Sequence, residues 1–96
     1  MLIILTYDVN IALSNGEKRL RKVAKLCESY GVRVQKSVFE LLVDNSQFIL
    51  IKSRLEDIID KENDSVRFYI LGNKWERKVE ILGKEILIKQ GDTLIL

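Results

Sequence analysis

The chain has 96 residues, of which 47% are hydrophobic and 31% are charged, and its formal net charge is +2. This length provides one small domain and excludes two domains or a doubly wound nucleotide-binding fold. The absence of His excludes His-based acid–base catalysis, His-containing nucleophilic triads and the usual zinc ligand sets. The single cysteine, Cys27, excludes an intrachain disulfide and favours a reducing compartment. We therefore expect a cytoplasmic protein with no membrane span and no secretion signal.

Charge is distributed unevenly along the chain. Residues 1–40 carry seven basic and four acidic side chains, and residues 65–96 carry six basic and four acidic ones. Between them, residues 41–64 carry three basic and six acidic side chains. This pattern indicates that one surface favours polyanions while another avoids them.

The first half of the chain predicts a strand and then a helix. Residues 2–5 are continuously apolar and continue into Thr6 and Tyr7, which is typical of a central strand, and Asp8 lies where this strand ends. After a polar loop, apolar residues recur every three or four positions and predict a helix over about 17–30. Gly31 is interpreted as the residue that closes this helix.

The second half predicts more strands around a second helix. Residues 32–43 are interpreted as one strand with a bulge or kink near 35–37, because the apolar alternation changes parity there. A second helix is expected over about 44–61. A third strand is expected at 66–71, and a short fourth strand at 79–81.

The order of these elements predicts an α+β fold of the ferredoxin-like βαββαβ type. Both helices would cover one face of a four-stranded antiparallel sheet, with strands one and three at its centre. The core would comprise residues 1–83, and the apolar tail 84–96 would add a strand to the sheet edge of a partner copy. The bare sheet face predicts a homodimer. The expected dimer contacts are Tyr7, Tyr69, Leu71, Thr93, Leu94, Ile95 and Leu96.

Asp8 is the candidate catalytic and metal-binding residue. Ligands gather beyond the carboxyl ends of strands in open sheets, although an Asp in this position also commonly caps a turn. One carboxylate holds Mg²⁺ poorly, but a twofold dimer would bring two copies of Asp8 to its axis. A cation there would activate water and polarise a phosphodiester, which is work that absent histidines cannot do.

Basic side chains are the candidates for binding nucleic-acid phosphates. An ordinary solvated surface is the competing interpretation. The candidates are Lys18, Arg19, Arg21, Lys22, Lys25, Arg33, Lys36, Arg67, Arg77 and Lys78.

Three stretches closely resemble the small CRISPR-associated endonuclease family, whose members are partners of the CRISPR integrase. These are LTYDV at 5–9, RLRKVAK at 19–25 with ESYGVRVQKSVFE at 28–40, and DSVRFY at 64–69 followed by LGNKWERKVE at 71–80. The resemblance implies a ferredoxin-like homodimer in which Asp8 of each copy binds Mg²⁺. It also implies a nuclease acting on RNA or double-stranded DNA. Leu20 interrupts a basic run that is unbroken in some members of the family.

Two hypotheses from different classes follow. The first is a Mg²⁺-dependent endonuclease that acts in spacer acquisition and CRISPR repeat maintenance. The second is a non-catalytic dimeric scaffold that binds duplex DNA and bridges integrase subunits. A third alternative is a ligand-sensing ferredoxin-like module, which would show no salt-dependent binding to nucleic acid.

Overall fold

A central strand organises the fold in the computed structural model, which describes residues 1–84. Strand β1 (Leu2–Asp8) is followed by helix α1 (Gly16–Tyr30) and by strands β2 (Gly31–Gln35) and β3 (Val38–Leu42). Helix α2 (Asn45–Ile58), strand β4 (Ser65–Gly72) and a 3₁₀ turn, η1 (Trp75–Arg77), complete the order. The sheet order is β2-β3-β1-β4, and every neighbouring pair is antiparallel.

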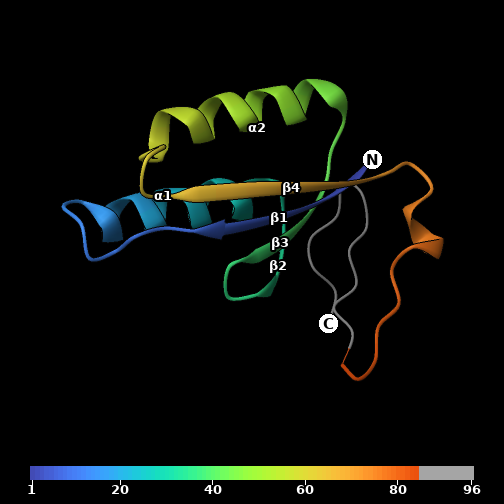
Figure 1. Cartoon of the computed structure of the whole chain (residues 1–96). Helices are drawn as coiled ribbons and strands as arrows, with labels where there is room; N and C mark the ends of the chain where they lie inside the picture. Colours follow the sequence, from blue (N-terminus) through green and yellow to red (C-terminus); the bar gives the residue numbers. More distant parts are fainter. Residues whose placement is uncertain (85–96) are drawn as a thin grey trace.

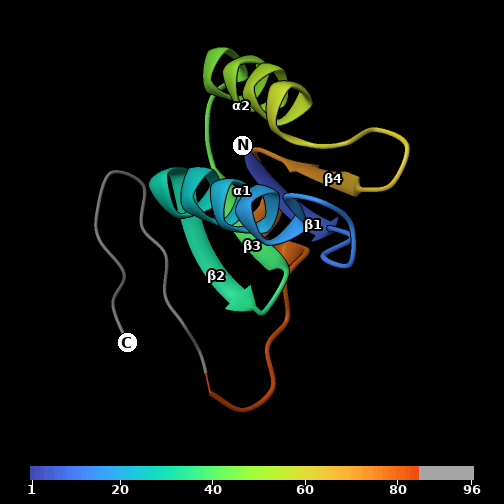
Figure 2. The ribbon, with the colours of Figure 1, turned by 90° about the vertical axis from the view of Figure 1, so that its left-hand side faces the viewer.

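Both helices pack on the same face of this sheet (Figures 1 and 2). Alternate residues of a strand point to opposite faces, and Ile3, Leu5 and Tyr7 of β1 point toward the helices. They join one buried cluster with Val23 of α1 and Ile51 of α2. The ferredoxin-like arrangement is confirmed, with β1 and β3 at the centre of the sheet.

The predicted strand over 32–43 is wrong, because the chain reverses direction inside it. The residues form a hairpin with a turn at Lys36 and Ser37, so β2 and β3 pair with each other. The reversal accounts for the parity change, and the register also shifts between Arg33 and Gln35. Because the hairpin adds a strand, the strand that we expected as the third, at 66–71, is the fourth strand of the structure, β4. It lies at the edge of the sheet.

Gly31 does not end α1 in a left-handed conformation, as we expected. Its φ of −162° and ψ of −162° are extended, and β2 begins at this residue. Steric crowding requires glycine at this position, because a Cβ atom would lie 2.2 Å from the carbonyl oxygen of Glu40. The tight approach of β2 to β3 therefore fixes this position.

Helix α2 begins with a full capping box. The Asp44 side chain accepts a hydrogen bond from the Gln47 backbone N–H at 2.8 Å, and the Gln47 side chain accepts one from the Asp44 N–H at 3.0 Å. The helix ends at Ile58, earlier than the residue 61 that we predicted. Its buried residues are Phe48, Ile51 and Leu55.

The C-terminal part departs further from the prediction. Residues 79–81 follow the η1 turn and form no strand. The tail residues Thr93, Leu94, Ile95 and Leu96 lie outside the described residues, so their pairing with a partner copy stays a prediction. Neither α-helix in residues 1–84 combines the length and the apolarity that a membrane crossing requires.

Candidate metal and nucleic-acid site

Asp8 is the last residue of the central strand and is exposed to solvent. Its cross-strand partner in β4 is Ser65, and it lies on the sheet face that the helices leave open, because Tyr7 beside it points into the core. No group of three or more Cys, Asp or Glu side chains within residues 1–84 is arranged to hold a metal ion. One copy of the described domain therefore presents the exposed carboxylate of Asp8 at this strand end without a preformed cluster of ligands.

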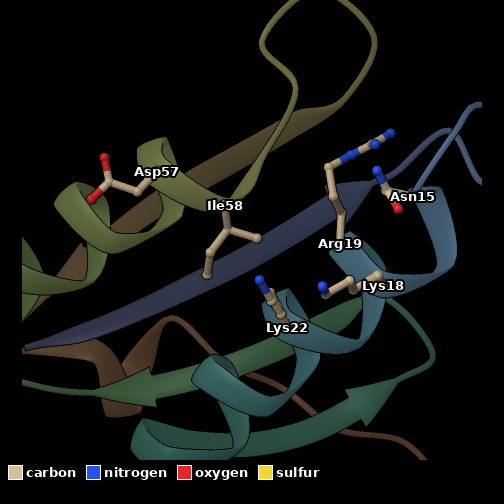
Figure 3. A pocket seen from close by; sticks show the side chains of 6 residues that line it. All are labelled: Asn15, Lys18, Arg19, Lys22, Asp57 and Ile58. Atoms are coloured by element: carbon tan, nitrogen blue, oxygen red, sulfur yellow. The ribbon is translucent and has the colours of Figure 1, made fainter.

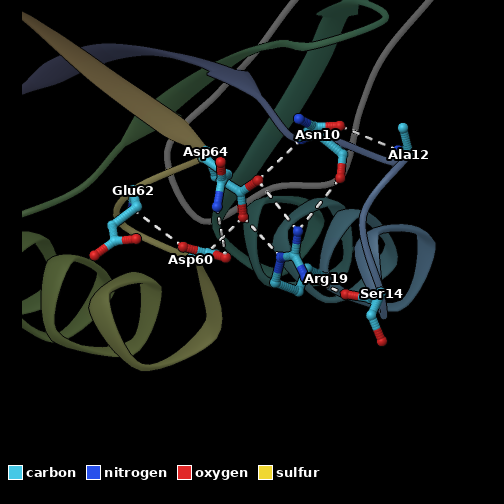
Figure 4. Close-up of polar contacts among 8 residues, drawn as sticks. Asn10, Ala12, Ser14, Arg19, Asp60, Glu62 and Asp64 are labelled. Carbon is cyan, nitrogen blue, oxygen red and sulfur yellow. Dashed lines mark hydrogen bonds and ion pairs between the residues drawn. The ribbon is translucent and has the colours of Figure 1, made fainter.

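A second carboxylate, Asp64, lies next to this strand end but is fully buried. Its Oδ1 accepts a hydrogen bond from the Asn10 backbone N–H at 2.9 Å, and its Oδ2 accepts one from the Asp60 backbone N–H at 2.9 Å (Figure 4). Asp64 immediately precedes Ser65, the partner of Asp8. This carboxylate is occupied by protein donors and is not available as a metal ligand.

Arg19 is the charged partner of Asp64, in contrast to its predicted role. Its Nε donates to Asp64 Oδ2 at 2.8 Å, and its Nη2 lies 3.4 Å from Oδ1. The guanidinium also donates to the carbonyl oxygens of Ser14 at 2.8 Å and Asn10 at 3.3 Å. Only 13% of the side chain is exposed. The donors of Arg19 are directed into the protein, so this geometry does not support its contact with nucleic acid, which stays a prediction.

The pKa values of this pair follow from its contacts. Burial by itself raises the pKa of Asp64, but hydrogen bonds from Arg19, from the Asp60 N–H and from the Asn10 N–H outweigh it, aided by the Arg19 charge. The pKa of Asp64 therefore lies below its ordinary value. The hydrogen bond to Asp64 raises the pKa of Arg19. Both groups are charged at neutral pH, and the pair is an ion pair.

No local signal in the sequence marks this ion pair. Arg19 stands out only as part of a basic run, and Asp64 is not among the predicted site residues. The two residues are 45 positions apart, and they meet only because α1 and the segment before β4 lie at the same end of β1. An acidic residue directly before the last strand is the one signal that could have drawn attention to Asp64.

The remaining predicted phosphate ligands are all exposed, but the structure does not collect them into one patch. Arg67 lies opposite Thr6 of β1 on the open face of the sheet, whereas the α1 residues lie in the helical layer on the other face. Arg33 also contacts Glu28 at 3.2 Å and lies 5.1 Å from the ring centre of Phe39. The exposed candidates are Lys18, Arg21, Lys22, Lys25, Arg33, Lys36, Arg67, Arg77 and Lys78.

Two of these lysines line an open pocket between α1 and α2. The pocket has a volume of about 500 Å³, and Lys18 and Lys22 extend along its α1 side (Figure 3). Asp57 and Ile58, at the end of α2, form the other side. Arg19 also lines the pocket but is paired with Asp64, so Lys18 and Lys22 are the two lining cations that remain to attract an anion along the α1 wall.

The predicted dimer contacts divide between the core and the open sheet face. Tyr7, which we expected on the open face, lies in the core, stacks on Phe39 and donates its hydroxyl to the Lys36 carbonyl at 3.4 Å. Burial raises the pKa of Tyr7, so its phenol stays neutral. Tyr69 lies on the open face opposite Ile4 and is 48% exposed. Leu71 is half-buried at the register shift between β1 and β4.

Fold and site together define a ferredoxin-like domain with one exposed acidic side chain at the end of its central strand. The family model described as "CRISPR associated protein Cas2" matches residues 1–79. The chain therefore belongs to the Cas2 family of CRISPR-associated proteins.

Curated relatives match this chain over almost its whole length. A protein named CRISPR-associated endonuclease Cas2, from Halalkalibacterium halodurans, is 50% identical over 95 residues, which cover 99% of both chains. One named CRISPR-associated endoribonuclease Cas2 3, from Rhodospirillum rubrum, is 47% identical over 99% of this chain and 100% of its own. The name of the second relative specifies RNA as the nucleic acid cleaved, whereas the name of the first specifies none.

Solved structures support the same family. The crystal structure of Streptococcus pyogenes Cas2 has a TM-score of 0.74 and 57% sequence identity, and covers 86% of this chain and 100% of that chain. A second structure, described as cas2, has a TM-score of 0.67 and 30% identity, and covers 100% of this chain and 98% of its own.

Proposed function

We propose that this protein is a homodimeric endonuclease in which the Asp8 carboxylates of two copies bind one divalent cation, Mg²⁺ in the cell. The substrate is a phosphodiester bond of DNA or RNA. The observation that carries the proposal is the exposed Asp8 carboxylate at the end of the central strand, beside an Asp64 that is fully occupied by protein donors. The endonuclease and endoribonuclease names of the relatives support it.

The donor chemistry of Asp8 fits the cation. Mg²⁺ binds carboxylate oxygens, keeps several of its waters, and is held by one or two carboxylates together with substrate phosphates. A second copy supplies the second carboxylate, because Asp64, which lies beside Asp8 in the same copy, is occupied by protein donors. When bound, the cation supplies a Lewis acid that activates water and neutralises charge on the phosphate.

The residues of the chain then have separate tasks. Asp8 places its carboxylate at the edge of the open sheet face, where it is accessible to substrate. Exposed basic side chains such as Arg67, on the same face, bind phosphates on either side of the scissile bond. Tyr7 does not exchange protons with substrate, because it is buried and donates to a backbone carbonyl. The cut position is set by where the backbone is bound, with little dependence on base sequence.

A second function, a scaffold for spacer acquisition, is favoured by the distribution of the basic residues. Lys18 and Lys22 lie in the helical layer, while Arg67 lies on the opposite face of the sheet. Cations on both faces suit a dimer that contacts duplex DNA along an extended path and bridges integrase subunits. Under this function, removal of residues 93–96 abolishes spacer acquisition, while Asp8→Asn preserves it.

A cleavage assay tests the enzymatic proposal. Purified parent, Asp8→Asn and Glu56→Gln are incubated with duplex DNA and with single-stranded RNA, with and without Mg²⁺. Glu56 is an exposed acidic residue on α2 that does not line the pocket, so its variant removes the same charge at a position outside both candidate sites. We expect cleavage that requires Mg²⁺, falls by about a hundredfold or more in Asp8→Asn, and persists in Glu56→Gln. Equal cleavage by Asp8→Asn and parent would contradict the proposal.

A further inference from the structure

We propose that Arg19 and Asp64 are positioning residues that fix the backbone on both sides of Asp8 and so set the direction of its carboxylate. The inference rests on the proposed function only in taking Asp8 as the metal ligand. Neither residue touches the substrate or the cation. Both act through the main chain that carries Asp8.

The ion pair joins the three segments that meet at the end of β1. Asp64 directly precedes Ser65, the cross-strand partner of Asp8, and thus holds the start of β4. Arg19 comes from the first turns of α1. The third segment is the loop that leaves β1 after Asp8, and both members of the pair bind it.

Asn10 is the point at which that loop is held. Its backbone N–H donates to Asp64 Oδ1 at 2.9 Å, and its carbonyl accepts from Arg19 Nη2 at 3.3 Å. The ion pair therefore binds both the backbone N–H and the backbone carbonyl of Asn10, two residues after Asp8. The Asn10 side chain then accepts from the Ala12 N–H at 3.1 Å, which continues the turn (Figure 4).

On the β4 side, two hydrogen bonds to the backbone of Asp60 hold Asp64. Its side chain accepts from the Asp60 N–H at 2.9 Å, and its own backbone N–H donates to the Asp60 carbonyl at 2.7 Å. Within the described residues, no buried side-chain nitrogen or oxygen is left without a partner. Because the network is complete, it specifies one backbone path on both sides of Asp8.

The ionised carboxylate is required for this arrangement. Each oxygen of Asp64 faces donors: the Asp60 N–H and Arg19 Nε at Oδ2, and the Asn10 N–H and Arg19 Nη2 at Oδ1. An Asn at this position keeps the size but directs an NH₂ group at one of these donor pairs. Asp64→Asn therefore releases one side of the network without creating a cavity.

Hydrogen exchange of the metal-free protein tests the positioning directly. The exchange rate of the Asn10 amide is measured by NMR relative to the Leu5 amide in the middle of β1. We expect Asp64→Asn to raise the Asn10 rate, relative to Leu5, by about tenfold. Glu56→Gln is the matched control, because Glu56 forms an exposed pair with Lys61 at 3.6 Å and has no hydrogen bond or ion pair to Arg19, Asp64 or Asn10 within residues 1–84. We expect it to leave the ratio unchanged.

Binding of Mn²⁺, used as the probe cation, measures the consequence for Asp8. Calorimetric titration of the folded proteins should show about tenfold weaker Mn²⁺ binding in Asp64→Asn and parent-like binding in Glu56→Gln. Arg19→Lys provides a second variant, since it keeps the positive charge but cannot reach Asp64 and both loop carbonyls together. We expect Arg19→Lys to weaken Mn²⁺ binding, as Asp64→Asn does.

Two results would overturn the inference. One is parent-like Mn²⁺ affinity and parent-like Asn10 exchange in folded Asp64→Asn and Arg19→Lys. The other is equal acceleration of the Asn10 and Leu5 amides, which would assign the pair to general stability. A parent that neither binds Mn²⁺ nor cleaves nucleic acid would contradict the proposed function instead, and the exchange ratio would still decide the positioning role.

Discussion

Asp8 and Ser65 are cross-strand partners in the β1–β4 ladder, so the exposed acidic residue lies next to the position that follows buried Asp64. Two carboxylates at one end of the sheet therefore have opposite environments. Asp8 faces solvent, whereas Asp64 is enclosed by protein donors. The contrast leaves the Asp8 carboxylate accessible to a ligand and gives the Asp64 carboxylate a structural role.

The Asp64 ion pair predicts a specific loss of stability. Removing one partner of a buried pair leaves the other charge uncompensated, so Asp64→Asn should lower the free energy of unfolding at pH 7 by about 3 kcal/mol. Urea unfolding followed by circular dichroism measures it. Glu56→Gln, which breaks an exposed pair, should change the same quantity by less than about 0.5 kcal/mol. Equal losses of unfolding free energy in the two variants would contradict the claim that the buried pair contributes more to stability than the exposed pair.

The same carboxylate predicts how stability depends on pH. Its pKa is lower in the folded protein than in the unfolded chain, where it is about 3.9. The stabilisation is therefore present above about pH 4 and is lost as the pH falls through the folded-state pKa. The difference in unfolding free energy between parent and Asp64→Asn should shrink between neutral pH and about pH 3. A difference that stays constant over this range would contradict the lowered pKa.

Gly31 predicts a steric effect on the hairpin. In Gly31→Ala the added Cβ would lie 2.2 Å from the Glu40 carbonyl oxygen and 2.5 Å from Leu41 Cδ2, so β3 must shift. We expect a loss of about 2 kcal/mol in unfolding free energy, measured by urea titration. Ser29→Ala, at an exposed position near the end of α1, should cost less than about 0.5 kcal/mol. A neutral Gly31→Ala would show that the two strands can separate without cost.

Much of the fold could be predicted because its local signals are strong. The apolar run of β1, the helical spacing of α1 and α2, and the position of Asp8 at a strand end are all visible in the sequence. The hairpin was missed because its turn, Lys36 and Ser37, contains neither Gly nor Asn, which commonly mark such a reversal.

The site was less predictable, because it depends on distant contacts. A continuous apolar run from Leu2 to Leu5 has no alternation, so the face of Tyr7 could not be determined from the pattern. Arg19 resembles its basic neighbours in sequence, and only the fold brings it to Asp64. The exposure of Lys18 and Lys22 agrees with the sequence, whereas the pocket that they line depends on the end of α2.

The two pocket lysines predict a salt-dependent contribution to nucleic-acid binding. In the double variant Lys18→Gln/Lys22→Gln, the dissociation constant for duplex DNA should rise, and the slope of log K against log salt should decrease by about one for each phosphate that the variant no longer binds. Fluorescence anisotropy over a range of salt concentrations measures both. Lys61→Gln removes one exposed charge outside the pocket and should leave the slope unchanged. An unchanged slope in the double variant would exclude these lysines from the DNA-binding surface.

The stoichiometry of Mn²⁺ binding tests the shared-carboxylate account most directly. Calorimetric titration of the dimer, with its mass checked by light scattering, should give one Mn²⁺ for every two chains, and Asp8→Asn should abolish this binding. One ion per chain, a monomer, or undiminished binding by Asp8→Asn would contradict the account.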